Sequence, residues 1–236
     1  MKENALSRRA FMRNVLGYGA LVTAGIPVIP CLCAAMGRRD YPQGMQTVVG
    51  DVRINGMPVA VGAPVRSGDV VTTGPPPAHA IFVMGRDAFL IRENTRIEVE
   101  TLSDTAENKV AHVLRIVRGK MLSVFGKGNK YIVTPTAVAG IRGTGMYTEA
   151  DPGITYICTC YGTTEIEARA VPGLKKRFRA RHHEHPIYIY GAGNGDRVMI
   201  PAPMKNHRDS ELILLASLVG RVPPFARKSP RTGNKY

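Results

Sequence analysis

The chain has 236 residues, enough for one or two domains with a substantial hydrophobic core. Hydrophobic residues make up 44% of the sequence, which is too apolar for a disordered protein, and 25 glycines and 17 prolines indicate a fold with many turns. The formal net charge of +14 favours polyanionic partners such as nucleic acid, anionic lipid headgroups or acidic envelope polymers, but does not choose among them.

Residues 1–35 have the features of an export signal. The run SRRAFM at residues 7–12 stands before a weakly apolar stretch. This arrangement resembles a twin-arginine signal, and Arg8, Arg9 and Phe11 are the residues that match it. We therefore expect a periplasmic protein, cleaved near residue 35 or, if the segment is retained, tethered to the inner membrane. Export also makes nucleic acid an unexpected partner, despite the positive charge.

From residue 45 onward, short apolar runs alternate with turn residues. Each run is closed by Gly, Pro, Asn or Asp, which is the pattern of an all-β sandwich or barrel. Residues 96–100 alternate strictly, so we expect a half-exposed strand with Ile97 and Val99 on its buried face. A hairpin over residues 80–91 is apolar on both faces, which predicts a central position.

The same region carries several short motifs with glycine at the turns. They are GDV at 50–52, SGDVVTTG at 67–74, GKM at 119–121 and TPTAVAGIRGT at 134–144. On these motifs the chain from residue 50 to about residue 162 resembles the FecR domain, named for periplasmic proteins that relay iron-siderophore signals to sigma factors. The resemblance implies a sandwich-like, noncatalytic module that binds or senses a protein or cell-envelope component, without a cofactor. Only Met1–Asn14 precedes the apolar stretch, so no anti-sigma segment and no direct sigma-factor control are expected.

Arg142 lies between two glycines in the most specific of these motifs. Gly140 and Gly143 permit positive φ or a close backbone approach on either side of it. Two interpretations follow: Arg142 is a contact for a ligand or partner, or it is a buried arginine that locks a loop. The second is favoured, because bidentate arginines often serve architecture.

The C-terminal third adds further elements. Residues 209–219 have apolar positions at helical spacing, and Asp209 or Ser210 can cap the helix that they predict. In chain order we expect a signal segment (1–35), a FecR-like β domain (45–165), additional strands (166–204), a helix with a proline turn (205–225) and a basic tail (226–236).

Two pairs of side chains have the chemistry of metal ligands. Cys158 and Cys160 share one face of a predicted strand, and an extended strand holds them too far apart for a disulfide. His183 and His185 likewise share a strand face, opposite His182 and Glu184. The four could complete a tetrahedral metal site only if the two segments pair. The favoured interpretation is two small core residues and surface histidines, with His207 distant from both.

Residues 175–181, KKRFRAR, form the densest positive run. They are either a solvated strand or a patch for an acidic polymer, lipid headgroups or an acidic partner. The chain could therefore instead be a basic cell-envelope scaffold that binds anionic wall polymer, or a metal or redox protein that uses the Cys-x-Cys and histidine residues. No phosphate loop or nucleophile elbow occurs in the sequence, so an enzyme is not expected.

Replacing both Arg8 and Arg9 by lysine should leave the protein in the cytoplasm, because the twin-arginine match motivates the expected export. Cell fractionation with an antibody against the full chain measures this. Unchanged periplasmic recovery of the double variant would show that another signal directs the chain.

Overall fold

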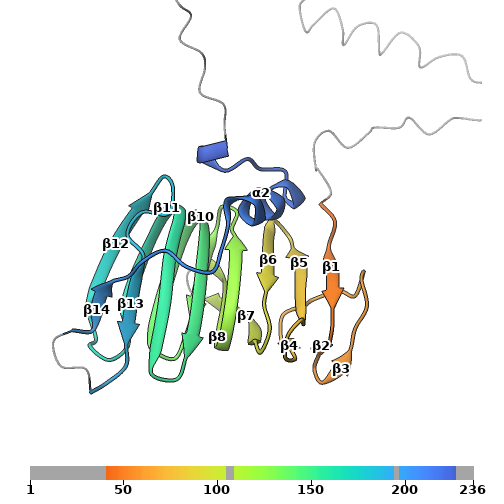
Figure 1. The fold of residues 1–236 in the computed structure, drawn as a ribbon, viewed down its shortest axis with the longest axis horizontal. Coiled ribbons are helices and arrows are strands. Elements are labelled where there is room, and N and C mark those ends of the chain that lie inside the picture. Colours follow the sequence, from red (N-terminus) through yellow and green to blue (C-terminus); the bar gives the residue numbers. More distant parts are fainter. Residues whose placement is uncertain (1–40, 105–108, 194–196, 227–236) are drawn as a thin grey trace, which may run out of the picture. The chain divides into compact units, whose positions relative to one another are not determined.

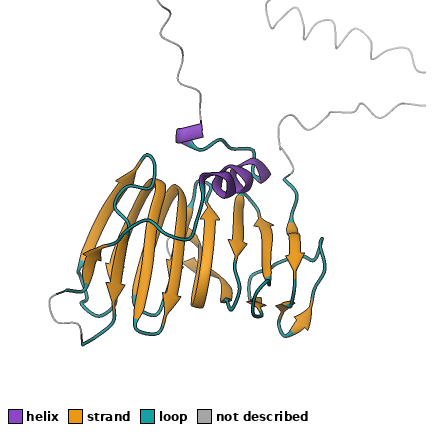
Figure 2. Cartoon of the chain, in the orientation of Figure 1, coloured by secondary structure: helices purple, strands orange, loops and turns teal. Residues whose placement is uncertain are grey.

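The computed structural model describes residues 41–104, 109–193 and 197–226. This part is almost entirely β-structure, which confirms the all-β prediction, with one α-helix near the C-terminal end (Figure 1, Figure 2). Arg8, Arg9 and Phe11 of the expected export signal lie outside the described residues. Within them, no helix is long and apolar enough to cross a bilayer.

The elements are β1 (Gly44–Val49), β2 (Val52–Ile54), β3 (Met57–Pro58), β4 (Val70–Thr73), β5 (His79–Met84), β6 (Asp87–Ile91), β7 (Arg96–Asp104), β8 (Lys109–Val124), β9 (Asn129–Val133), β10 (Ala137–Asp151), β11 (Ile154–Ala168), β12 (Lys175–Ala180), β13 (Ile187–Tyr190), β14 (Met199–Pro201), α2 (Asp209–Leu218) and the 3₁₀ turn η1 (Pro224–Ala226).

Three long strands, β8, β10 and β11, each belong to both halves of the 14-stranded sheet. Residues 109–118 of β8 pair with β7 and, in part, with β9, whereas residues 119–124 pair with β10 and, in part, with β6. β10 pairs with β9 through residues 138–141 and with β8 through residues 145–150. β11 pairs with β13 through residues 154–157 and with β12 through residues 162–167. The sheet therefore folds into two layers. We call the layer with β1, β5, β6, β13 and β14 the helix-covered layer, and the layer with β2, β3, β4, β7, β9 and β12 the second layer.

Glycine makes two of these changes of partner possible. Gly119 adopts a φ of 103° in β8, and a Cβ there would collide with the side chain of Thr95. Gly162 adopts a φ of 96° in β11, and a Cβ there would lie 2.8 Å from the carbonyl oxygen of Gly143. Both conformations are rare for residues with a side chain, so each position requires glycine. The expected boundary between residues 165 and 166 falls inside β11.

The main hydrophobic core fills the space between the two layers. Phe82 and Phe89 stack with ring centroids 4.9 Å apart, and Phe125 packs edge-on against Phe89 at 5.5 Å. The second layer contributes Ile97 and Val99, both buried, which confirms the alternation predicted for residues 96–100. Aromatic pairs in these arrangements add to the stabilisation that comes from burial alone.

The outer face of the helix-covered layer is also apolar, and α2 covers it. The hairpin of β5 and β6 turns Phe82 and Phe89 inward and Ile81 and Leu90 outward, so its predicted central position is confirmed. In Figure 1, α2 lies across the ends of β6 and β8. The buried residues of this second cluster that come from the helix and its C-terminal end are Leu212, Leu215, Ala216 and Val219.

The start of α2 differs from the expectation in its cap. The helix begins at Asp209 with Arg208 as the N-cap residue, and the Glu211 carboxylate accepts the Arg208 backbone N–H at 2.9 Å. Asp209 and Ser210 therefore do not cap the helix. The Asp209 carboxylate instead accepts hydrogen bonds from two histidine rings, which removes it from the helix end.

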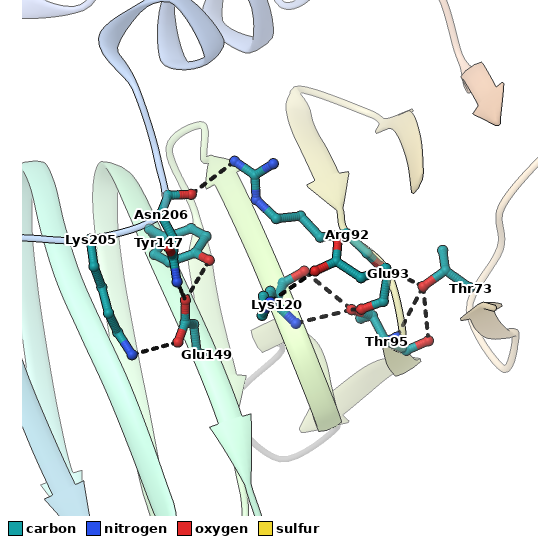
Figure 3. A network of polar contacts seen from close by, with 9 residues as sticks. All are labelled: Thr73, Arg92, Glu93, Thr95, Lys120, Tyr147, Glu149, Lys205 and Asn206. Carbon is teal, nitrogen blue, oxygen red and sulfur yellow. Dashed lines mark hydrogen bonds and ion pairs between the residues drawn. The ribbon is translucent and has the colours of Figure 1, made fainter. Parts of the chain in front are cut away.

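Glu149 fastens the segment before α2 to strand β10. Its carboxylate accepts hydrogen bonds from Asn206 and Lys205 at 2.6 Å each and from the Tyr147 hydroxyl at 2.7 Å (Figure 3). Nearby, Arg92 donates to the Asn206 carbonyl at 2.9 Å. Burial opposes ionisation of Glu149, but the three donors prevail and lower the pKa of its carboxyl.

Replacing Glu149 by Gln should lower the free energy of unfolding at neutral pH by about 1–3 kcal/mol, because charge-assisted hydrogen bonds are lost. A carboxylate whose pKa falls on folding stabilises the native state above its unfolded pKa of about 4.3, and this contribution disappears as pH drops through the lower native value. Urea unfolding between pH 3 and 7 should therefore show a shallower loss of stability below about pH 4.3 in the variant than in the wild type. Identical acid profiles would contradict this role.

Candidate metal centre

Cys158 and Cys160 lie on β11, on the face that α2 covers. Both side chains are fully buried, and both thiols are free. Ile157 points the other way, into the core between the layers. The alternation that placed the two cysteines on one strand face is therefore present, and it directs both sulfur atoms toward the loops that precede β13 and α2.

His183 reaches the same place from the loop between β12 and β13. Its backbone has a φ of 53°, and its N–H donates to the Cys160 carbonyl at 2.8 Å, which anchors the loop to β11. The side chain is only 5% exposed. Because the chain bends here, the alternating strand expected for residues 182–185 is absent, and that expectation is wrong.

His207 completes the group from the segment just before α2. It is 5% exposed, and its ring stacks on Tyr147 with centroids 4.6 Å apart. Docking of α2 on the helix-covered layer thus brings His207 over the two cysteines. A helical period shows which side of a helix is apolar but not where the helix docks, so the sequence alone does not place His207 near the cysteines.

The four donor atoms lie near the spacing of a tetrahedral site. Cys158 Sγ lies 3.7 Å from His183 Nδ1, and His183 Nδ1 lies 2.9 Å from His207 Nε2. Together with Cys160 Sγ, all four atoms lie within 4.8 Å of one another. Tetrahedral zinc with ordinary Zn–S and Zn–N bonds requires ligand separations of roughly 3.3–3.8 Å, so small side-chain adjustments suffice.

Hydrogen bonds fix the far side of each imidazole. His183 Nε2 donates to Asp209 Oδ1 at 2.8 Å, and His207 Nδ1 donates to the Lys205 carbonyl at 2.7 Å. When both rings are neutral, their unprotonated nitrogens, Nδ1 and Nε2 respectively, face each other. A carboxylate or carbonyl behind a histidine is the usual outer support of a metal ligand. Two facing lone pairs 2.9 Å apart need a proton or a metal ion between them.

The two thiols differ in acidity. A hydrogen bond from Cys160, and further ones involving His183 and His207, lower the pKa of the Cys158 thiol to about 4. Burial, together with the neighbouring Cys158 sulfur, raises the pKa of Cys160. Burial opposes protonation of His183, but hydrogen bonds to Cys158 and Asp209 outweigh it and raise the pKa of the imidazole. One anionic sulfur therefore forms readily, and a bound cation would favour the second.

His182 and Asp209 form the outer edge of the site. Asp209 lies between the two rings, 2.9 Å from His182 Nε2 and 2.8 Å from His183 Nε2. His182 is half-exposed and also packs against Phe225, with ring centroids 4.6 Å apart. These residues lie on the solvent side of the buried ligand group, and with His183 they also bring three potential donor atoms within 4.8 Å of one another.

The structure thus brings together three of the four residues considered as ligands in the sequence: Cys158, Cys160 and His183. His185 is exposed, with a φ of 58° directly before Pro186, and it is not part of the group. Arg142 is exposed at the irregular step of β10, and its side chain has no hydrogen bond or ion pair within the described residues. Its favoured interpretation as a buried, loop-locking arginine therefore does not fit this position.

Comparisons with known proteins add little. No family model matches the chain, and no curated protein matches its sequence. Two crystal structures of candidate anti-sigma factors from Parabacteroides distasonis ATCC 8503 are similar, each with a TM-score of 0.45. One is 10% identical over 58% of this chain and 60% of its own, and the other 13% identical over 64% and 65%. The chain therefore spans less than two thirds of either.

The geometry predicts which histidine substitutions remove a bound ion. Protein purified without a histidine tag should contain about one equivalent of zinc or a similar ion, as a four-ligand site requires. His183→Ala and His207→Ala should lose it, whereas the control His185→Ala should retain it. Elemental analysis of the wild type and the three variants measures this metal content. Equal loss in His185→Ala, or no metal in the wild type, would contradict the ligand set.

Proposed function

We propose that this chain is a noncatalytic, exported binding module of the FecR-like kind, in which a closed Cys₂His₂ metal site fastens the C-terminal helix to the sheet. The observation that carries the metal site is the pair of imidazole nitrogens 2.9 Å apart over two buried thiols, each ring supported from behind. This departs from the expectation of a chain without a cofactor. The motifs at residues 7–12 and 50–162 support the export and the binding role.

The ligand set favours zinc. Two thiolates and two imidazoles are a common tetrahedral zinc set, whereas carboxylate and carbonyl oxygens suit magnesium or calcium. All four ligands come from protein and all are buried, so no coordination position stays open for water or substrate. Structural zinc sites have this closed arrangement, and catalytic ones keep a position free.

A second arrangement at the same residues needs separate consideration. Cys158, His183 and Asp209 follow one another as a nucleophile, a base and an orienting carboxylate would. A catalytic thiol, however, must meet its substrate, and the Cys158 side chain is fully buried. This burial supports a metal ligand rather than a nucleophile. Alkylation of Cys158 in the folded, metal-loaded protein by iodoacetamide would favour the enzyme instead.

The metal site ties together segments that are distant in sequence. Its ligands come from β11, from the loop before β13 and from the segment before α2. A bound ion would therefore fix the N-terminal end of α2 on the layer that this helix covers. A sensing role would follow from this connection, because release of the ion weakens the attachment of the helix. Loading before export fits the twin-arginine route, which carries folded proteins.

Removal of the metal should loosen α2 more than the rest of the fold. Binding at a thousandfold excess over Kd stabilises the native state by about 4 kcal/mol, so chelation should lower Tm by about 10 °C in a chain of this size. Hydrogen exchange should accelerate most over residues 205–219, and Cys158→Ser should show the same pattern without chelator. His185→Ala is the matched control and should respond to chelator as the wild type does. A metal-loaded protein whose Tm and exchange ignore chelation would refute this structural role.

A further inference from the structure

The outer face of the second layer carries two arginines whose side chains form no ion pair with a described residue. Arg142 on β10 lies directly opposite Thr163 on β11, and Thr163 lies opposite Arg179 on β12. The three positions form one row across three neighbouring strands. Both arginine side chains are exposed, and neither guanidinium group has a hydrogen bond or ion pair with any described residue.

The remaining outward cations of β12 are paired, which sets this row apart. Lys175 faces Glu167 on β11 and forms an ion pair at 3.1 Å. Arg177 faces Glu165 and forms an ion pair at 2.9 Å. At the next outward position β11 offers Thr163 in place of a carboxylate. The positive charge of Arg179 therefore adds to that of Arg142 rather than being neutralised across the strand pair.

The surface is hollowed at this point. A groove is lined by Tyr131, Gly140, Arg142, Thr163, Glu165 and Arg179, among others. Gly140 lies opposite Tyr131 on β9, and a Cβ at Gly140 would rest in van der Waals contact with the tyrosine ring at 3.5 Å. The glycine thus leaves a bare stretch of backbone as the floor. Tyr131, 40% exposed, supplies an aromatic wall beside the two cations.

The row has dimensions suited to an oxyanion. Adjacent strands lie about 4.8 Å apart, so the backbones of Arg142 and Arg179 are separated by about 10 Å with Thr163 between them. Two long arginine side chains can converge over that distance, and the threonine hydroxyl, which has no partner within the described residues, lies below. Guanidinium groups bind phosphate through paired, charge-assisted hydrogen bonds.

We propose that this groove binds the phosphate groups of an anionic, phosphodiester-linked polymer, with Arg142 and Arg179 on the phosphate and Tyr131 against the carbon skeleton. The excess of positive charge beyond residue 35 draws a polyanion to the surface, and the row provides a defined place for its phosphate. This inference deepens the binding role proposed above by naming the ligand class. It does not involve the metal centre, because none of the groove residues is a metal ligand.

The test measures binding of poly(glycerol phosphate) to the purified full chain by isothermal titration calorimetry at about 0.15 M salt, where weak surface attraction is screened. Arg142→Ala and Arg179→Ala should each weaken binding by about tenfold or more, as loss of a charge-assisted pair predicts. Lys176→Ala is the matched control: it removes one positive charge from the same strand, at an exposed position on the opposite face. Its affinity should change less than about twofold. Metal content and Tm of all three variants should equal those of the wild type.

Other outcomes would overturn the assignment. Equal weakening by Lys176→Ala would show attraction to net charge rather than a site. Equal affinity for poly-L-glutamate would show that the groove does not distinguish phosphate from carboxylate polymers. If inorganic phosphate binds and the polymer does not, the ligand is not a polymer. Unchanged binding in both arginine variants would show that the groove is not the binding site. Since metal content is measured on the same samples, failure of the groove and failure of the metal site are told apart.

Discussion

The fold depends on covering an outer sheet face that is itself apolar. Ile81, Val83 and Leu90 point away from the core between the layers, and water would have to solvate them if α2 were absent. Leu212 and Leu215 take over that contact. Fully burying one such side chain contributes about 1.5–3 kcal/mol, so detachment of the helix would expose several such contributions at once.

Polar contacts give this apolar cover a single position. Hydrophobic burial alone is non-directional and would tolerate sliding of a short helix. Glu149 fixes the segment before the helix through Lys205 and Asn206 (Figure 3), and Arg92 reaches the first turn through Glu211. Two residues after Lys205, the ring of His207 meets the buried thiols. Directional hydrogen bonds and ligand geometry thus set the register that nonpolar packing leaves open.

The sequence predicted the strands and the central hairpin better than the contacts between distant segments. Strict alternation located the buried face at Ile97 and Val99, and apolar runs on both faces marked the central hairpin, because both patterns are local. The ligand role of His207 depends on where α2 docks, and His185 was misplaced because the chain bends with positive φ at His183 and His185. The favoured interpretation of Arg142 was a buried side chain that locks a loop, yet the strands that surround it leave its side chain in solvent. Long-range placement and unusual backbone conformations are not local patterns.

The three long strands shared by both layers have a consequence for how the chain can come apart. A conventional sandwich can lose one sheet while the other keeps its ladder, but here β8, β10 and β11 supply hydrogen bonds to both layers. Asp87 on β6 and Lys130 on β9 form a buried ion pair that also spans the layers. Separating the two layers therefore means breaking hydrogen-bond ladders that run along the same three strands. We expect the two layers to unfold as one cooperative unit rather than one after the other.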